Sequence, residues 1–522
     1  MSFTNDPRWE DRVDDACLIA CTIENAQLIK GYTEYTINVQ RGCGQGAHSW
    51  KVQHRYKNFA RLNKELSCAG LCLNLPPKKL FGNLDQEFVA ERLQGLQVCQ
   101  VTRHYEHAAV QTACAYALGV NQYRSPQAFS RRLLLFRGHC ERNGLQSVSI
   151  CLRNLRGWKV LQPWNSVGWR TSKQYFLVES LDGDKRKDVL TWSSYGADWC
   201  LDVSGTQSVL QLMCSLRHPY LQTPLFTWSS ESGNLTVRQQ MMEGSLRDQI
   251  CRAKPSDLFQ KKYCNPDTIF PLDLQDVKFI GRHVLEALRF LRQLGVPFCN
   301  LHCGNLFITS HGCELAGVEN GVLGLTSIYR PFMLQLKAIK TVEDMDVYCF
   351  AHVLYEMATG EPLHQAHLVS TGIDCDRRIR PLLLSLLSPE VLNSQLPSID
   401  TLVNDELFRM VPVSKSSGKQ FSMTAKVKRA LDACRAHIEE RLHQEQTEFR
   451  RALTCLKFRA YVNSQEQRQQ RRRLMKQLTT KPLSVSDDPA QSDAVLPQQH
   501  AQVVKAEAEE EATDPAAPEP SG

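Results

Sequence analysis

The stretch Val277-Lys-Phe-Ile-Gly-Arg-His-Val-Leu-Glu-Ala-Leu-Arg-Phe-Leu291 decides the fold class of the central part of this chain. Its apolar residues recur at steps of three and four, which places them on one continuous face of an α-helix. Three short strand-like runs precede it, at Tyr175-Phe-Leu-Val178, Val189-Leu-Thr-Trp192 and Leu235-Thr-Val237. Strands followed by helices predict an α+β domain with two lobes, which we assign to residues 156–412.

Composition limits the function classes that remain. The chain has 522 residues, of which 42% are hydrophobic and 22% charged, as in ordinary globular proteins. A net charge of +7 is too small to indicate a nucleic-acid binder. We find neither a transmembrane stretch of about 20 apolar residues nor a signal peptide, and we expect a cytoplasmic protein. The 20 cysteines are scattered, so we expect reduced thiols and no metal site.

Four further segments flank the central domain. Residues 15–97 alternate apolar and polar positions before an amphipathic run, which predicts a small α+β domain with a sheet and helices. Residues 98–155 follow no period, and we interpret them as a divergent domain end and a linker. Residues 424–478 read as a long basic helix, and the acidic tail over 484–522 is expected to be disordered. The helix carries an apolar stripe, for which packing on the preceding lobe is favoured over a coiled coil: Val427, Leu431, Cys434, Ile438 and Leu442.

The N-terminal segment resembles the PX-domain signature in three places, in order and spacing. These are Arg55-Tyr-Lys-Asn-Phe59, Leu75-Pro-Pro-Lys-Lys79 and Phe88-Val-Ala-Glu-Arg92. The resemblance predicts a PX domain over residues 15–130 that diverges from the family after residue 97. It also implies a phosphoinositide ligand, phosphatidylinositol 3-phosphate.

The same resemblance implies a role for each of four residues. Arg55 pairs with the 3-phosphate, Tyr56 stacks under the inositol ring, Lys79 meets the 1-phosphate and Arg92 holds ring hydroxyls. A guanidinium suits a pair of phosphate oxygens, with roughly 1.5–3 kcal/mol for each well-formed charge-assisted hydrogen bond. For one short motif, solvated arginines and a half-buried tyrosine are the better interpretation. Three matching motifs favour the lipid site.

The central domain resembles a protein kinase from about residue 164 to 412. Four segments carry the likeness: Leu216-Arg-His-Pro-Tyr-Leu221, Met242-Glu-Gly-Ser-Leu-Arg-Asp248, Asp346–Gly360 and Thr401–Phe408. By analogy, Asp346 braces the backbone of the catalytic loop.

The residues for phosphoryl transfer are missing at the positions that the resemblance indicates. Asn300 occupies the place of the catalytic aspartate, Gly317 that of the magnesium aspartate, Trp192 that of the nucleotide-binding lysine and Val209 that of its glutamate partner. Asn305 is retained, either as a remnant magnesium ligand or, the favoured hypothesis, as a loop hydrogen-bonder. We therefore predict a pseudokinase with no cofactor, in which Trp192 crowds the nucleotide pocket.

The combination of domains resembles the family of kinase-like proteins that carry a PX domain and modulate Na,K-ATPase. It implies binding to Na,K-ATPase β subunits, a role in endosomal receptor trafficking, and a peripheral location on endosomal and plasma membranes. The family's actin-binding WH2 segment is not found here, and actin binding is not expected. Two alternatives remain: an atypical active Ser/Thr kinase that recruits Glu319 or Asp344 as its acid, and a soluble pseudokinase regulator that binds no lipid.

Overall fold

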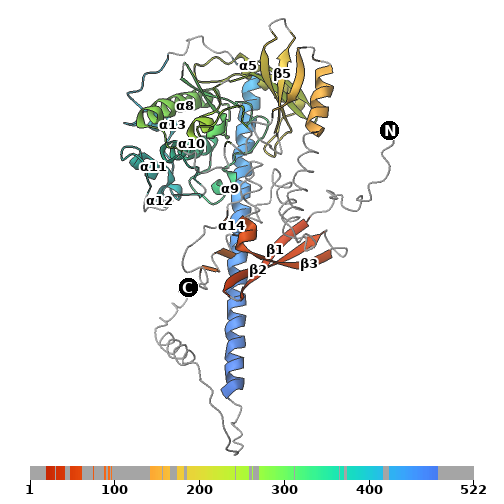
Figure 1. Ribbon diagram of the computed structural model, residues 1–522, viewed down its shortest axis with the longest axis vertical. Coiled ribbons are helices and arrows are strands. Elements are labelled where there is room, and N and C mark those ends of the chain that lie inside the picture. The colour runs from red at the N-terminus through yellow and green to blue at the C-terminus, as the bar shows by residue number, and fades with distance from the viewer. Residues whose placement is uncertain are drawn as a thin grey trace, which may run out of the picture. The chain divides into compact units, whose positions relative to one another are not determined.

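The structure is a computed structural model, and it describes most of the residues between 19 and 479 (Figure 1). The described residues are 19–29, 31–41, 48–60, 75, 88–89, 92–93, 96, 142–153, 155, 157–164, 173–181, 185–241, 243–257, 262, 270–310, 312–363, 365–368, 373–414 and 423–479. The side chains of 19–22, 39–41, 48–50, 452–453 and 455–479 are outside the description. Lys79, most of 98–155 and the tail over 484–522 also lie outside it.

The N-terminal domain is built on a three-stranded antiparallel sheet. Its strands are β1 (Ile19–Ile29), β2 (Tyr32–Arg41) and β3 (His48–Arg55), in that order. A tight turn joins β1 to β2, with Gly31 at a φ of 83°, a backbone conformation that glycine adopts without a steric penalty. Alternation along the strands, together with a helical segment over 56–60, directs four side chains into the core: Tyr35, Ile37, Val52 and Phe59.

The first lobe of the central domain is a five-stranded antiparallel sheet with the order β4-β5-β6-β8-β7. The strands are β4 (Trp158–Pro163), β5 (Lys173–Ser180), β6 (Lys187–Ser193), β7 (Phe226–Ser230) and β8 (Gly233–Gln239). Helix α5 (Val203–Ser215) packs beside β7. A helix over 142–153, which the irregular sequence did not predict, packs Val148 and Cys151 against side chains of β5, β6 and β8.

The second lobe is mainly helical and confirms the predicted two-lobed α+β architecture. Helix α8 (Leu274–Leu294) contains the predicted apolar face; Asp273 caps its start and Gly295, at a φ of 73°, ends it. Helix α10 (Val342–Thr359) is buried along most of its length and lies at the centre of this lobe. The remaining elements are α6 (Leu246–Ile250), η5 (Cys303–Asn305), β9 (Leu306–Thr309), β10 (Gly312–Leu315), α9 (Arg330–Met333), α11 (Arg380–Leu387), α12 (Pro389–Leu392) and α13 (Ile399–Val403).

The predicted basic helix forms as α14 (Ala425–Thr479). The core of the central domain includes three residues of the predicted apolar stripe, Leu431, Ile438 and Leu442, together with Phe449 further along the helix. This contact confirms the packing interpretation for the first half of the helix. From residue 458 the chain forms a separate unit, in which α14 continues to Thr479. Within the described residues, no helix is both long and apolar enough to cross a membrane.

Candidate functional site

Two of the four residues predicted to bind lipid, Tyr56 and Arg92, are in direct contact. Tyr56 follows the end of β3 directly, and Arg92 lies with its guanidinium carbon 4.3 Å from the centre of the Tyr56 ring. The same carbon is 4.2 Å from the centre of the Phe88 ring, one helical turn away. Arg92 is only 5% exposed, so it is not the solvated surface charge of the alternative interpretation.

Arg55 contacts a different aromatic ring, that of Tyr32. Its guanidinium carbon lies 3.1 Å from the centre of the Tyr32 ring, at the start of β2, and the residue stays half-buried. Tyr35 is fully buried, and burial raises the pKa of its hydroxyl although the nearby Arg92 opposes that rise. Ring faces attract guanidiniums, so these contacts hold two cations in place at the edge of the sheet.

The loop between α8 and β9 is the segment that the sequence resemblance aligns with a kinase catalytic loop. The backbone N–H of Cys299, which has a φ of 58°, donates to Asp346 Oδ1 at 2.8 Å, so Asp346 braces the loop as predicted. Asn305 Nδ2 donates to the carbonyl oxygen of Asn300 at 2.6 Å, and Asn305 Oδ1 accepts from the N–H of His302 at 3.0 Å. Both polar atoms of Asn305 thus bond within the loop, which supports the favoured hypothesis for this residue.

The pH dependence of stability should report the buried Asp346. Burial raises the pKa of this carboxyl from 3.8 to about 7, although the Cys299 N–H partly opposes the rise. The folded state therefore holds the proton more tightly than the unfolded state, and stability falls as pH rises through that interval. Asp346→Asn removes this dependence and can still accept from Cys299.

We expect the Asp346→Asn variant to gain stability relative to wild type between pH 4 and 7. The difference should grow by at most about 1.4 kcal/mol per pH unit and become constant above pH 7. Urea denaturation at a series of pH values measures it. Two stability curves that stay parallel across this interval would contradict a buried, protonated Asp346.

A buried ion-pair group that the sequence did not predict occupies the space between the lobes. Glu319, fully buried after β10, pairs with Arg238 from β8 and lies 3.7 Å from the Lys173 ammonium on β5. Lys173 Nζ also donates to Asn320 Oδ1. Burial alone would raise the pKa of Glu319, but Arg238 and Lys173 outweigh it and the pKa is lowered. We call Lys173, Arg238 and Glu319 the interlobe ion-pair group.

Trp192 lies on the wrong face of the sheet for the position that the sequence assigned to it. It packs with Leu190 and Leu235 in the cluster that the helix over 142–153 covers. Thr191, the residue before Trp192 on β6, is in register with Thr236 on β8 and, beyond it, with Thr227 on β7. The Thr227 hydroxyl lies 3.7 Å from Cys214 Sγ of α5. Thr191 rather than Trp192 therefore faces α5, and the expected crowding of the pocket by the indole is wrong.

The other degenerate positions have structural roles. Val209 is fully buried in the core, and the α5 sequence VSGTQSVLQLMCS contains no carboxylate that could pair with a lysine. Gly317 has a φ of 85° and accepts from the N–H of Asn320 at 3.0 Å, so it forms a tight turn. A Cβ at Gly317 would lie 2.6 Å from Asn320 Nδ2, which explains the glycine without reference to magnesium.

The two replacement acids of the active-kinase hypothesis are both engaged elsewhere. Glu319 belongs to the interlobe ion-pair group. Asp344 Oδ2 accepts from the N–H of Thr341 at 2.9 Å and from its hydroxyl at 2.8 Å, which caps the first turn of α10. Among the side chains that the structure describes, no group of three His, Cys, Asp or Glu residues could hold a metal ion.

The missed residues share one feature that sequence could have flagged. Arg238 and Lys173 are long cations on strands of a sheet whose two faces are both covered. A charge at such a position is buried only when it is paired. The partner, however, is 81 residues away along the chain from Arg238, a distance that no local period reveals.

Similar proteins combine the same two parts. Residues 43–106 match the family model of the PX domain. A "PX domain-containing protein kinase-like protein" of Mus musculus is 37% identical over 440 residues, covering 84% of this chain and 73% of that protein. The "Slowpoke-binding protein" of Drosophila melanogaster is 28% identical, over 51% of this chain and 55% of its own.

A third relative matches a smaller share of the chain. The "Probable inactive serine/threonine-protein kinase slob1" of Dictyostelium discoideum is 25% identical, over 40% of this chain and 38% of its own. The Mus musculus relative agrees with this chain over most of its sequence, and the family model of the PX domain matches the N-terminal part. The chain belongs to the family of PX domain-containing protein kinase-like proteins.

Proposed function

We propose that this protein is a phosphoinositide-binding, membrane-recruited adaptor whose kinase-like domain is non-catalytic. The observation that carries the proposal is the Arg92 guanidinium held over the ring of Tyr56, the residue next to Arg55. Two arginines, each with its guanidinium against an aromatic ring, suit an inositol carrying a phosphate, because forked donors match phosphate oxygens and a ring can cover an apolar sugar face. The proposed ligand is phosphatidylinositol 3-phosphate.

Lipid binding should depend on Arg55. Arg55→Ala removes one charge-assisted contact, which corresponds to about 1.5–3 kcal/mol, or a roughly 10- to 150-fold weaker affinity. Sedimentation of the full chain with vesicles measures it, with 3-phosphorylated phosphatidylinositol in one set and unphosphorylated lipid in the other. Lys51→Ala is the matched control, because this substitution also removes one positive charge from β3, at a side chain that is well exposed.

The outcomes separate the lipid site from general charge attraction. Equal losses in Arg55→Ala and Lys51→Ala would indicate attraction to any anionic surface and would reject the proposed site. Equal binding by wild type and Arg55→Ala would reject Arg55 as a lipid contact, and a wild type that sediments with neither vesicle would favour the alternative of a regulator that binds no lipid. Circular dichroism of both variants confirms that the sheet remains folded.

Two observations support the proposal that the domain is non-catalytic: the contacts that the candidate acids make and the composition of the loop before β9. Glu319 and Asp344, the two candidate replacement acids, are occupied by the interlobe ion-pair group and by the α10 cap. The catalytic loop FCNLHCGN offers no carboxylate that could orient a substrate hydroxyl. A relative whose name describes an inactive kinase is consistent with this. Phosphate transfer from radiolabelled ATP that disappears in Asn305→Ala would contradict it.

The proposed partners are membrane proteins, with Na,K-ATPase β subunits as those that the family resemblance implies. The location would be peripheral, on endosomal and plasma membranes, where the protein would influence receptor trafficking. Its mechanism is local concentration, because a weak headgroup contact and a weak protein contact add when both lie on one surface. Co-sedimentation with vesicles that contain the β subunit, compared with lipid alone, tests this part.

A further inference from the structure

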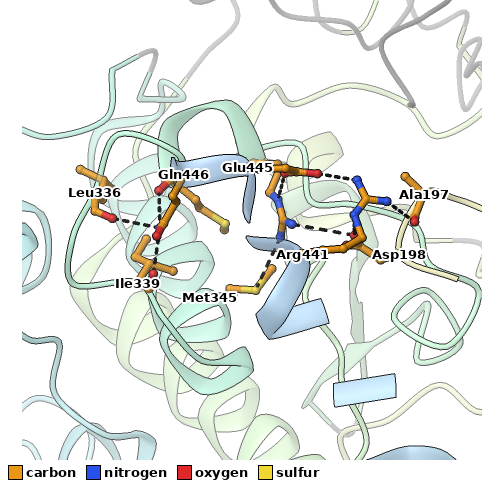
Figure 2. Close-up of polar contacts among 10 residues, drawn as sticks. Ala197, Asp198, Leu336, Ile339, Met345, Arg441, Glu445 and Gln446 are labelled. Carbon is orange, nitrogen blue, oxygen red and sulfur yellow. Dashed lines mark hydrogen bonds and ion pairs between the residues drawn. The ribbon is translucent and has the colours of Figure 1, made fainter. Parts of the chain in front are cut away.

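The first half of α14 is fastened to the kinase-like domain by buried polar contacts, not only by its apolar face (Figure 2). Arg441 Nε lies 3.2 Å from Asp198 Oδ1, and the same guanidinium donates to the carbonyl oxygen of Ala197. Glu445, one turn further on, accepts from Arg330 Nε at 2.8 Å. The loop between β6 and α5 is therefore bound directly to the helix.

Gln446 fixes the rotation of α14 about its own axis. It is 3% exposed, and its Nε2 lies within hydrogen-bond distance of three backbone carbonyl oxygens. These belong to Met333 at 3.1 Å, Leu336 at 3.0 Å and Ile339 at 2.9 Å (Figure 2). These contacts keep the face of α14 that carries Arg441 turned toward the loop between β6 and α5.

Cys434 lies on that face, and Cys200 lies opposite it. Cys434 precedes Arg441 by seven residues, two helical turns, while Cys200 follows Asp198 by two residues in the loop. The two Sγ atoms are 3.9 Å apart. Cys200 is exposed to solvent, whereas Cys434 is 2% exposed.

We propose that Cys200 and Cys434 are a redox modification site, at which hydrogen peroxide converts the two thiols into a disulfide that joins the β6–α5 loop to α14. The residues are 234 apart in the sequence, so the bond would close a very long loop. The contacts of Arg441 and Gln446, which do not involve sulfur, already hold the two cysteines opposite each other. To form the bond, the sulfur atoms must close from 3.9 Å to about 2.05 Å.

The chemistry starts at the exposed thiol. The pKa of Cys200 is lowered, chiefly by the hydrogen bond with Cys434, and thiolate is the reactive form. The Cys200 thiolate attacks one peroxide oxygen, which gives a sulfenic acid and, after protonation, water. The Cys434 sulfur then displaces hydroxide from the Cys200 sulfur and loses its proton, which forms a second water. In total, two thiols and one peroxide give one disulfide and two waters.

Peptide mapping of the full chain tests the proposal. Reduced protein is treated with hydrogen peroxide, alkylated and digested with trypsin. A peptide over 188–217 linked to the peptide over 430–435 is expected, with the loss of two hydrogens. Because the first peptide also contains Cys214, the link must persist in Cys214→Ser and disappear in Cys200→Ser. The oxidised wild type should also unfold at a higher temperature than the reduced form, and dithiothreitol should reverse the shift.

Two results would overturn the proposal. One is a peroxide-treated wild type whose Cys200 carries sulfinic acid without any linked peptide. The other is a link that survives in Cys200→Ser. Cys200→Ser changes an exposed side chain, so it is the informative variant if the buried substitution Cys434→Ser fails to fold.

Discussion

Glu319→Ala is expected to lower the free energy of unfolding of the kinase-like domain by about 3–5 kcal/mol. The substitution leaves the guanidinium of Arg238 and the ammonium of Lys173 buried between the lobes without their shared carboxylate. Denaturant unfolding followed by tryptophan fluorescence measures the loss. Glu231→Ala provides the matched control, because Glu231 is an exposed carboxylate in the turn before β8 and should change stability by less than about 0.5 kcal/mol.

Acid titration adds a second test of the same group. The pKa of Glu319 is lowered in the folded protein, so its contribution to stability is present above the ordinary value of 4.5 and is lost as pH falls below it. The stability difference between wild type and Glu319→Ala should therefore shrink in acid. A Glu319→Ala variant as stable as the Glu231→Ala control at neutral pH would show that the pairs contribute little.

Leu442→Ala is expected to cost about 2–5 kcal/mol, because it opens a cavity where α14 packs against the kinase-like core. Leu442 has no exposed surface in the folded domain. Leu181→Ala is the control, since Leu181 is 54% exposed and loses the same atoms without leaving a cavity. Thermal and urea unfolding of the full chain compare the two variants.

The size of this effect decides whether α14 belongs to the domain. A cooperative transition that includes α14 should shift as a whole in Leu442→Ala. If instead Leu442→Ala behaved like Leu181→Ala, α14 would be a helix that forms beside the domain without stabilising it. The buried Gln446, whose amide nitrogen lies within hydrogen-bond distance of three backbone carbonyl oxygens, argues for the first outcome.

Local patterns in the sequence predicted the elements whose stabilising contacts repeat with a helix or strand period. The apolar face of α8, the strand runs in β5, β6 and β8, and the stripe on α14 all appear as predicted. The helix over 142–153 was missed because only two of its side chains, Val148 and Cys151, are buried in the sheet cluster. Two apolar positions are too few to stand out against the surrounding histidines, cysteines and arginines.

The types of the candidate lipid-binding residues were predictable from the sequence, but their geometry was not. The order of Arg55, Tyr56 and Arg92 in the sequence indicated their chemistry. Only the structure places the Arg92 guanidinium between Tyr56 and Phe88, because that contact joins the end of β3 to a helical segment more than thirty residues later. Trp192 shows the limit of counting, since an error of one residue on a strand moves a side chain to the opposite face.

By itself, the amino-acid sequence determined the two domains, their order and the absence of carboxylates from the loop FCNLHCGN, because these follow from residue type and local period. The tertiary structure alone decided that Glu319 binds Arg238 and Lys173, and that Cys200 meets Cys434. Each of these contacts joins residues from separate elements far apart along the chain. Burial makes such pairs strong, and only the packed fold defines which charges and thiols are buried together.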